Sequence, residues 1–303
     1  MKTHRQLLGC AALVGATLLW SGSFVVARAL HDEVSPVALN YLRWVLAAAL
    51  LLVLFGRGIA AARRALRREW KLVVAAGLTG MAAFHTCMFY ALQHTGALNA
   101  VLILSLSPVA ILSISWLATG KAIGPAQAIG AGVSLVGAAW LVVRGDPSAL
   151  AGLQVNRGDA WMLAGVALWA AYSVLLQRRP ADLAPGVLLA ASAAAGVALM
   201  TPLYAFELAR GAAGLSLNAG VLGGILYLGL GGAVVAFFLW SRGVAAVGAA
   251  TAGQFLHLLP LFGAVLAVVL LGERIAPYHF AGALLIFAGI ACTQSFPFNW
   301  KSS

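Results

Sequence analysis

Long apolar runs that contain no charged residue constrain this chain more than any other feature. Two of them, residues 184–206 and 247–271, hold no Asp, Glu, Lys or Arg. Each has at least the roughly 20 residues that a helix needs to cross about 30 Å of hydrocarbon. Because lipid offers the backbone no hydrogen-bond partner, such runs must be helical. With 62% hydrophobic and only 9% charged residues, the chain has too little charge for the surface of a soluble protein.

The sequence predicts ten membrane-spanning helices joined by short polar connections. We expect the first to be a retained helix and not a cleaved signal, because its apolar run is longer than usual and further spans follow. The predicted fold class is therefore all-α integral membrane, a multi-pass protein of the inner (plasma) membrane that is surrounded by the lipid bilayer. The predicted spans are residues 7–30, 36–55, 72–93, 97–119, 123–143, 159–177, 184–206, 217–241, 247–271 and 275–295.

The net charge of +11 is carried mainly at the ends of the apolar runs, which is how topology is set and not how nucleic acid is bound. Thirteen Lys and Arg residues fall on the side of the N-terminus and six on the other, so we predict that both termini are cytoplasmic. The basic stretch 57–71 is expected to be a solvated topology signal, with an amphipathic surface helix as the alternative. The cytoplasmic set is Lys2, Arg5, Arg57, Arg63, Arg64, Arg67, Arg68, Lys71, Lys121, Arg178, Arg179, Arg242 and Lys301.

An internal repeat organises the chain. A shift of 152 residues aligns Gly96–Ala139 with Gly248–Ala291 without a gap, and 13 of 44 positions are identical. This composition would give about five by chance. We therefore expect two domains, residues 1–146 and 147–303, with five helices each. Because five is odd, the two halves must have opposite orientations, as in transporters that work by alternating access. The matched pairs include Gly96/Gly248, Pro108/Pro260, Gly120/Gly272, Pro125/Pro277, Gly130/Gly282 and Gly137/Gly289.

Several segments together resemble the drug/metabolite transporter superfamily, in particular its EamA-type exporters with ten helices. They are Leu19-Trp-Ser-Gly-Ser-Phe24, Arg43, Tyr90-Ala-Leu-Gln-His-Thr-Gly-Ala-Leu-Asn-Ala100, the Pro-containing helix that follows, and Leu271-Gly-Glu-Arg-Ile-Ala276. The resemblance implies an inverted 5+5 fold with a central cavity lined by spans 1, 3, 4, 6, 8 and 9. It also implies export of amino acids or other small metabolites. The aromatic-rich first and sixth spans are similar to those of aromatic amino-acid exporters.

All eight acidic residues lie at span ends. Ion-coupled carriers usually keep a carboxylate at mid-membrane, so coupling here uses histidine or there is no ion coupling. The three cysteines fall inside spans and show no metal-binding spacing, and we expect no cofactor and no metal.

Two histidines are candidates for the cavity. His257 is expected roughly 15 Å along span nine, near the midplane, in one polar stripe with Thr251 and Gln254. It either lines the cavity or hydrogen-bonds a neighbouring helix. His85 has the same two alternatives.

Trp20 and Trp169 are a repeat-related pair, each about ten residues inside its span. With Phe24 and Tyr172 they either pack against neighbouring helices or form two walls for an apolar or aromatic side chain. The predicted substrate-binding residues are Trp20, Phe24, His85, Tyr90, Asn99, Ser105, Trp169, Tyr172, Gln254 and His257.

Arg43 lies inside the second span near its outer end. Snorkelling to the surface, or pairing with Asp32 or Glu33, is favoured over binding a substrate carboxylate. We therefore expect no charged residue deep in the cavity.

Pro108 and Pro260 are predicted hinges, because each removes a backbone hydrogen bond near the middle of its helix, with plain kinks that have no gating role as the alternative. The glycines at 130, 137, 282 and 289 share helix faces and indicate close packing, with a homo-oligomer contact as the alternative.

These features favour a secondary transporter that exports small neutral metabolites, and we expect aromatic or other apolar amino acids. A drug or metabolite exporter of another substrate class is the first alternative, and an integral-membrane enzyme built on a Ser–His pair is a weaker one. The expected partners are a small-molecule substrate and lipid, without nucleic acid.

Overall fold

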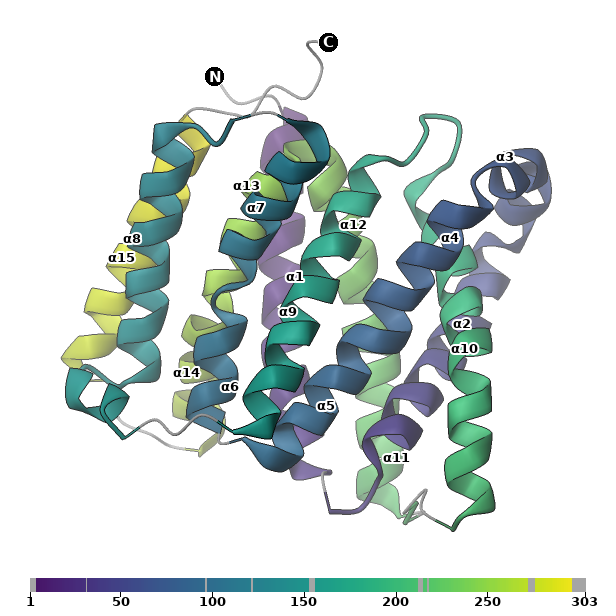
Figure 1. Cartoon of the computed structure of the whole chain (residues 1–303), viewed down its shortest axis with the longest axis horizontal. Coiled ribbons are helices and arrows are strands. Elements are labelled where there is room, and N and C mark those ends of the chain that lie inside the picture. The colour runs from purple at the N-terminus through teal and green to yellow at the C-terminus, as the bar shows by residue number, and fades with distance from the viewer. Residues whose placement is uncertain are drawn as a thin grey trace.

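The computed structural model describes residues 4–30, 32–95, 97–120, 122–152, 156–211, 215–216, 218–271 and 276–295. Every regular element within those residues is a helix, and the long helices run side by side as a bundle (Figure 1). The elements are α1 (His4–Ala29), α2 (Pro36–Ala61), α3 (Arg63–Arg68), α4 (Trp70–Ala76), η1 (Gly77–Ala83), α5 (Phe84–His94), α6 (Ala97–Leu104), α7 (Ser107–Thr119), α8 (Pro125–Val142), η2 (Pro147–Leu150), α9 (Arg157–Gln177), α10 (Pro185–Ala209), α11 (Ala219–Leu226), η3 (Tyr227–Val235), α12 (Ala236–Val247), α13 (Ala249–Gln254), η4 (Phe255–His257), α14 (Leu258–Leu271) and α15 (Pro277–Ser295).

Nine helical segments of the described chain are long and apolar enough to cross a membrane, and a shorter apolar helix covers Pro277–Thr293. The all-helical, multi-pass architecture is thereby confirmed for these residues, while the count of ten spans stays a prediction. The nine segments are His4–Ala27, Pro36–Ala61, Trp70–His94, Ala100–Thr119, Pro125–Val142, Arg157–Gln177, Pro185–Ala209, Ala219–Val247 and Ala249–Leu266.

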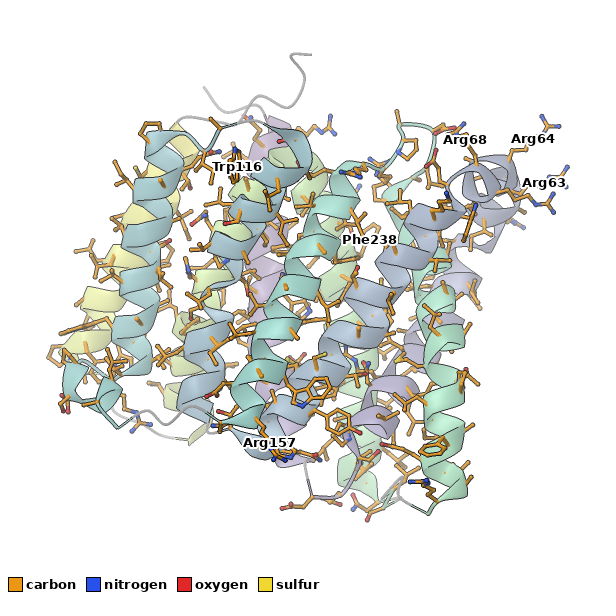
Figure 2. All side chains as sticks on the ribbon, in the orientation of Figure 1. Arg63, Arg64, Arg68, Trp116, Arg157 and Phe238 are labelled. Atoms are coloured by element: carbon orange, nitrogen blue, oxygen red, sulfur yellow. The ribbon has the colours of Figure 1, made fainter. Side chains whose placement is uncertain are left out.

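The two halves of the chain repeat the same irregularities in the same order. The third span of each half contains a π-helical stretch, η1 in the first half and η3 in the second. The fourth span of each half is interrupted in its middle, between α6 and α7 and again at η4. The first helices of the halves begin at opposite ends of the bundle, because α1 starts at the upper end of Figure 1 whereas Arg157 opens α9 at the lower end (Figure 2). Equivalent helices therefore run in opposite directions.

The breaks in the fourth spans follow from the prolines that come just after them. Pro108 has no N–H to give to the carbonyl of Leu104, four residues earlier. The hydroxyl of Ser107 donates to that oxygen instead, at 2.6 Å. The sequence therefore folds here as two helices, α6 and α7, joined at residues 105–106.

The glycines of α8 and α15 form a contact within the chain. A Cβ built on Gly130 would lie 2.6 Å from the carbonyl oxygen of Gly289, and one on Gly137 would lie 2.8 Å from that of Gly282. Missing side chains thus let the two backbones touch, as expected for close helix packing in lipid. An oligomer built on these faces stays a prediction.

The basic stretch after the second span is helical, and its arginines are exposed. Its residues complete α2, form the short α3 and begin α4. Figure 2 shows Arg63, Arg64 and Arg68 at the end of the bundle opposite Arg157. Arg68 forms an ion pair with Asp182 at 3.1 Å. The short helix α3 thus keeps these three arginines together at one end of the molecule.

Candidate functional site

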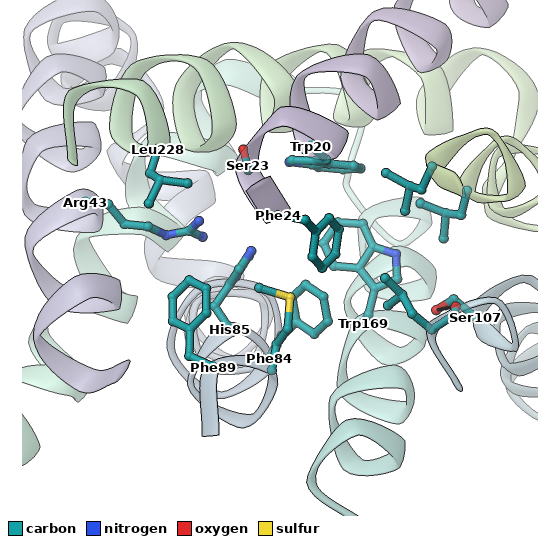
Figure 3. A pocket seen from close by; sticks show the side chains of 14 residues that line it. Trp20, Ser23, Phe24, Arg43, Phe84, His85, Phe89, Ser107, Trp169 and Leu228 are labelled. Carbon is teal, nitrogen blue, oxygen red and sulfur yellow. Dashed lines mark hydrogen bonds between the residues drawn. The ribbon is translucent and has the colours of Figure 1, made fainter. Parts of the chain in front are cut away.

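A pocket lies in the bundle between the opening helices of the two halves, α1 and α9 (Figure 3). Measured at the centres of water-sized spheres, its free space is about 40 Å³, enough for a few waters. It is too small for an amino acid, so this conformation has to open before a solute can enter. The lining residues are Trp20, Ser23, Phe24, Arg43, Phe84, His85, Met88, Phe89, Leu104, Ser107, Trp169, Leu228, Leu256 and Leu259.

The repeat-related tryptophans meet at one side of the pocket. The rings of Trp20 and Trp169 are 5.0 Å apart and perpendicular, and Phe84 lies 5.0 Å from Trp169. Edge-to-face contacts of this kind fix ring orientation while leaving apolar surface available to a ligand. Trp20 and Trp169 thus pack against neighbouring rings and also line the pocket, and their contact with a substrate side chain stays a prediction.

Trp20 is held in place by the π-helical stretch η3. Its Nε1 donates to the carbonyl of Gly232 at 2.9 Å. A π-helix leaves some carbonyls without the usual partner four residues later, which makes such an acceptor available. Nε1 of Trp169 is buried without a hydrogen-bond partner among the described residues. The pair is therefore related by the repeat but not chemically equivalent.

Arg43 corrects our expectation from the sequence. It neither snorkels nor forms an ion pair with Asp32 or Glu33, but lies in the pocket wall with only 1% of its surface exposed. Its Nε and Nη2 have no hydrogen-bond partner within the described part of the chain. Its guanidinium carbon stands 5.5 Å from the ring of Trp44 and 5.7 Å from that of Phe89. A charged residue does lie deep in the cavity, because the second span turns this side chain inward.

His85 lines the pocket beside Arg43 (Figure 3). Its ring packs on Phe84, with centroids 4.5 Å apart, and it is 4% exposed. The imidazole of His85 and the guanidinium of Arg43 together give the pocket a polar end. Trp20, Phe24, His85 and Trp169 are thus the predicted site residues that the structure brings together.

Five other predicted residues lie away from the pocket lining. Tyr172 stacks behind Trp169 at 5.4 Å and fills the space left by Gly80, whose added Cβ would lie 2.5 Å from the tyrosine ring. Tyr90 is half-buried and stacks on Trp161, with centroids 5.9 Å apart. The remaining three, Ser105, Gln254 and His257, meet one another elsewhere. Contacts of these residues with substrate stay predictions, and the side chain of Asn99 lies outside the described residues.

His257 joins the two interrupted spans at equivalent positions. Its Nε2 lies 2.9 Å from the carbonyl of Ser105, its own mate in the repeat. A carbonyl can only accept, so Nε2 carries a proton and donates it. Nδ1 lies 2.7 Å from the hydroxyl of Ser134 on α8, and Gln254 reaches the same hydroxyl at 3.2 Å. His257 is 0% exposed, so it is a helix-bridging histidine in this conformation.

A second cavity adjoins the pocket. Phe24, Leu104 and Leu259 line both, and the second cavity continues between α1, α6, α8, α14 and α15 with about 510 Å³ of free space on the same measure. It reaches Arg144, after the end of α8, and His279 at the start of α15. These three apolar side chains are therefore shared by the small pocket and the wider space beside it.

Sequence reasoning missed several lining residues. Ser23, Phe84, Met88 and Leu228 carry no signal that distinguishes them from ordinary apolar or small residues of a span. Arg43 did carry one, because a charge inside an apolar run marks a functional position by default. Among the residues that the structure describes, no three His, Cys, Asp or Glu side chains form a group that could hold a metal ion.

Comparison with known proteins agrees with this architecture. The chain matches the EamA-like transporter family twice, over residues 7–143 and 156–294. A solved crystal structure of a chain with 23% identity has a TM-score of 0.77 and covers 100% of both chains, which shows a shared fold.

Relatives with similar sequences span almost the whole chain. An uncharacterized transporter of Archaeoglobus fulgidus is 27% identical over 281 residues, 92% of this chain and 94% of the relative. The uncharacterized transporter YdeK of Bacillus subtilis is 29% identical over 287 residues, 92% of this chain and 94% of the relative. A probable terminal-alkyne amino-acid exporter of Streptantibioticus cattleyicolor is 26% identical over 279 residues, 92% of this chain and 91% of the relative. With both halves of the chain matched, this multi-pass membrane protein belongs to the EamA-like transporter family, within the drug/metabolite transporter superfamily.

Proposed function

We propose that this transporter exports small amino acids with aromatic or other apolar side chains across the inner membrane. The observation that carries the proposal is the pocket between the two halves, where Trp20 and Trp169 meet at 5.0 Å from equivalent helices. Aromatic walls bind an apolar side chain by area and ring contact, and discriminate among such side chains by only a few kcal/mol. We therefore expect broad specificity within this class.

Alternating access supplies the mechanism. The pocket is small in this conformation, and Phe24, Leu104 and Leu259 line both it and the wider cavity. Because the halves are related by an inverted repeat, exchanging their conformations would close one path and open its counterpart at the other end. In this proposal the wider cavity faces the outside, and the termini are cytoplasmic.

An amino-acid substrate has support from one relative, the probable exporter of Streptantibioticus cattleyicolor, whose printed name specifies a terminal-alkyne amino acid. An alkyne side chain is short and apolar, which suits a pocket walled by aromatic rings. An exporter of other metabolites or drugs remains the alternative. Catalysis by Ser134 and His257 is disfavoured, since both are 0% exposed and neither lines the pocket.

The test is flux in proteoliposomes. The purified protein is reconstituted, and uptake of labelled phenylalanine, leucine and tryptophan is measured with and without an imposed pH gradient. We expect saturable flux, with Trp20→Ala and Trp169→Ala lowering kcat/KM by about tenfold or more through lost ring contact. Trp116→Ala is the matched control, because this indole is 48% exposed and lies in α7, away from the pocket.

The outcomes separate the alternatives. Saturable flux that ignores the gradient supports a uniporter, and flux that follows it supports proton antiport. If none of the three amino acids moves while other metabolites do, the amino-acid assignment is wrong. Equal losses in Trp116→Ala and Trp20→Ala would place the site elsewhere.

A further inference from the structure

Arg43 is a buried cation in the wall of the pocket. Nε and Nη2 are buried and have no partner within the described residues. The faces of Trp44 and Phe89 are its neighbours at 5.5 and 5.7 Å. A ring face attracts the charge but does not replace the in-plane acceptors that a guanidinium fork requires.

No acidic side chain pairs with Arg43 within the described residues, and three of the acidic residues are engaged elsewhere. Glu207 accepts from the hydroxyl of Ser35 at 2.6 Å. Asp159 accepts from Thr95, also at 2.6 Å, and Asp182 pairs with Arg68. An unpaired charge inside a membrane protein is costly, and a position that keeps one usually faces a ligand. The free fork of Arg43 opens onto the pocket that it lines.

The pocket is polarised along its length. Figure 3 shows Arg43 and His85 toward one side and Phe24 and Trp169 toward the other. A carboxylate can accept two parallel hydrogen bonds from a guanidinium, which is a strong charge-assisted geometry for such a fork. None of the 14 lining residues is acidic. A substrate ammonium would therefore meet ring faces and neutral oxygens, such as the hydroxyls of Ser23 and Ser107, but no carboxylate.

We propose that Arg43 binds the carboxylate of the transported solute, and that an amino group is dispensable. The substrate class is then small carboxylic acids with an apolar body, of which the amino acids proposed above are one case. The inference rests on the proposed function in using the same pocket. It differs in naming the carboxylate as the required group.

A ligand series tests the carboxylate directly. The purified protein in micelles is titrated with phenylalanine, 3-phenylpropanoate and phenylalaninamide, with binding followed by the thermal midpoint. These ligands share the phenyl group and differ in the two charged groups. We expect both carboxylates to bind with similar affinity and the amide to bind at least about tenfold more weakly, the loss of one charged contact. Equal binding of the amide, or no shift with any of the three, would overturn the proposal.

Substitution of the arginine gives an independent readout. Arg43→Gln should abolish the preference for the acids over the amide, and Arg43→Lys should restore part of it as a point charge. Because Gln removes an unpaired buried charge, the unliganded variant should melt at the same or a higher temperature than the wild type. If Arg43 had only a structural role, Arg43→Gln would instead lower the melting temperature of the unliganded protein. Arg57→Gln, on the exposed part of the same helix α2, is the matched control.

The two proposals can fail separately. If 3-phenylpropanoate binds through Arg43 but no amino acid is transported, amino-acid export falls and the carboxylate site stands. If liposomes carry phenylalaninamide as fast as phenylalanine, export stands and the carboxylate site falls.

Discussion

His257 shows how one side chain can join two halves of a molecule at equivalent positions. It donates to the carbonyl of Ser105, which lies where the proline of the first half interrupts its span. Backbone groups at such a break have lost their regular hydrogen-bond partner, so a side chain from the repeat-related helix can supply one. In this conformation the histidine therefore stabilises the junction of two interrupted helices.

We expect His257→Ala to lower stability. The change removes hydrogen bonds to Ser105 and Ser134 and leaves buried polar groups unpaired, which costs about 1–3 kcal/mol. Denaturant titration in micelles measures the effect. His94→Ala is the control, because that ring is exposed and hydrogen-bonds the carbonyl of Tyr90 in its own helix. Unchanged stability together with lost proton-driven flux would instead assign His257 to proton transfer.

Helix pairs and helix breaks are the features that matter at the scale of elements. α8 and α15 touch through glycines on both sides, so their spacing is set by the absence of side chains. The interrupted spans, in contrast, meet through polar groups and carry the two prolines. The contact between α8 and α15 is therefore a rigid pairing. The contact between the interrupted spans is a junction that already lacks a backbone hydrogen bond.

Gly130→Ala tests the rigid pairing. The added Cβ would lie 2.6 Å from the carbonyl of Gly289, so the helices must separate, at a cost of about 1–3 kcal/mol. Gly132→Ala, two residues along the same helix and with nothing within 4 Å of its added Cβ, should be neutral or slightly stabilising. Melting in micelles compares the two, and equal midpoints would show that the helices do not pack through this face.

Pro108→Ala and Pro260→Ala test the junction as a hinge. Restoring each N–H should favour a continuous helix, and we expect the double variant to transport at least several-fold more slowly with little change in substrate affinity. Single-turnover flux and equilibrium binding separate these two effects. A double variant with the wild-type rate would exclude hinge motion at these positions.

At the scale of the whole molecule, charge distribution predicts how the bundle sits in the membrane. Arg63, Arg64 and Arg68 gather at one end and Arg157 lies at the other (Figure 2). The positive-inside tendency places the end with the cluster in the cytoplasm. An exporter so oriented takes up its substrate at that end.

Thiol labelling in intact cells checks this orientation. In a background without Cys10, Cys87 and Cys292, a membrane-impermeant maleimide should label Arg157→Cys and leave Arg64→Cys unlabelled until the cells are opened. Both positions are exposed, so access to the reagent and not burial decides the result. The opposite labelling pattern would invert the topology and with it the direction assigned to the wider cavity.

The sequence by itself determined the membrane class, the helical architecture, the repeat and the family, because each depends on residue order along one chain. A run of apolar residues must become a helix in lipid whatever surrounds it. The pairing of Trp20 with Trp169 was also accessible, since the repeat makes them equivalent. The two breaks at Pro108 and Pro260 were accessible because proline acts locally.

Only the tertiary structure decided which side chains face the pocket. Arg43 turns inward, while His257 bonds a neighbouring helix at the mirror position of the repeat. Both outcomes depend on how each helix is rotated about its axis and which helix lies beside it. A membrane helix carries apolar residues on all of its faces, so hydrophobic periodicity does not reveal how the helix is rotated. Contacts between distant segments fix that rotation instead.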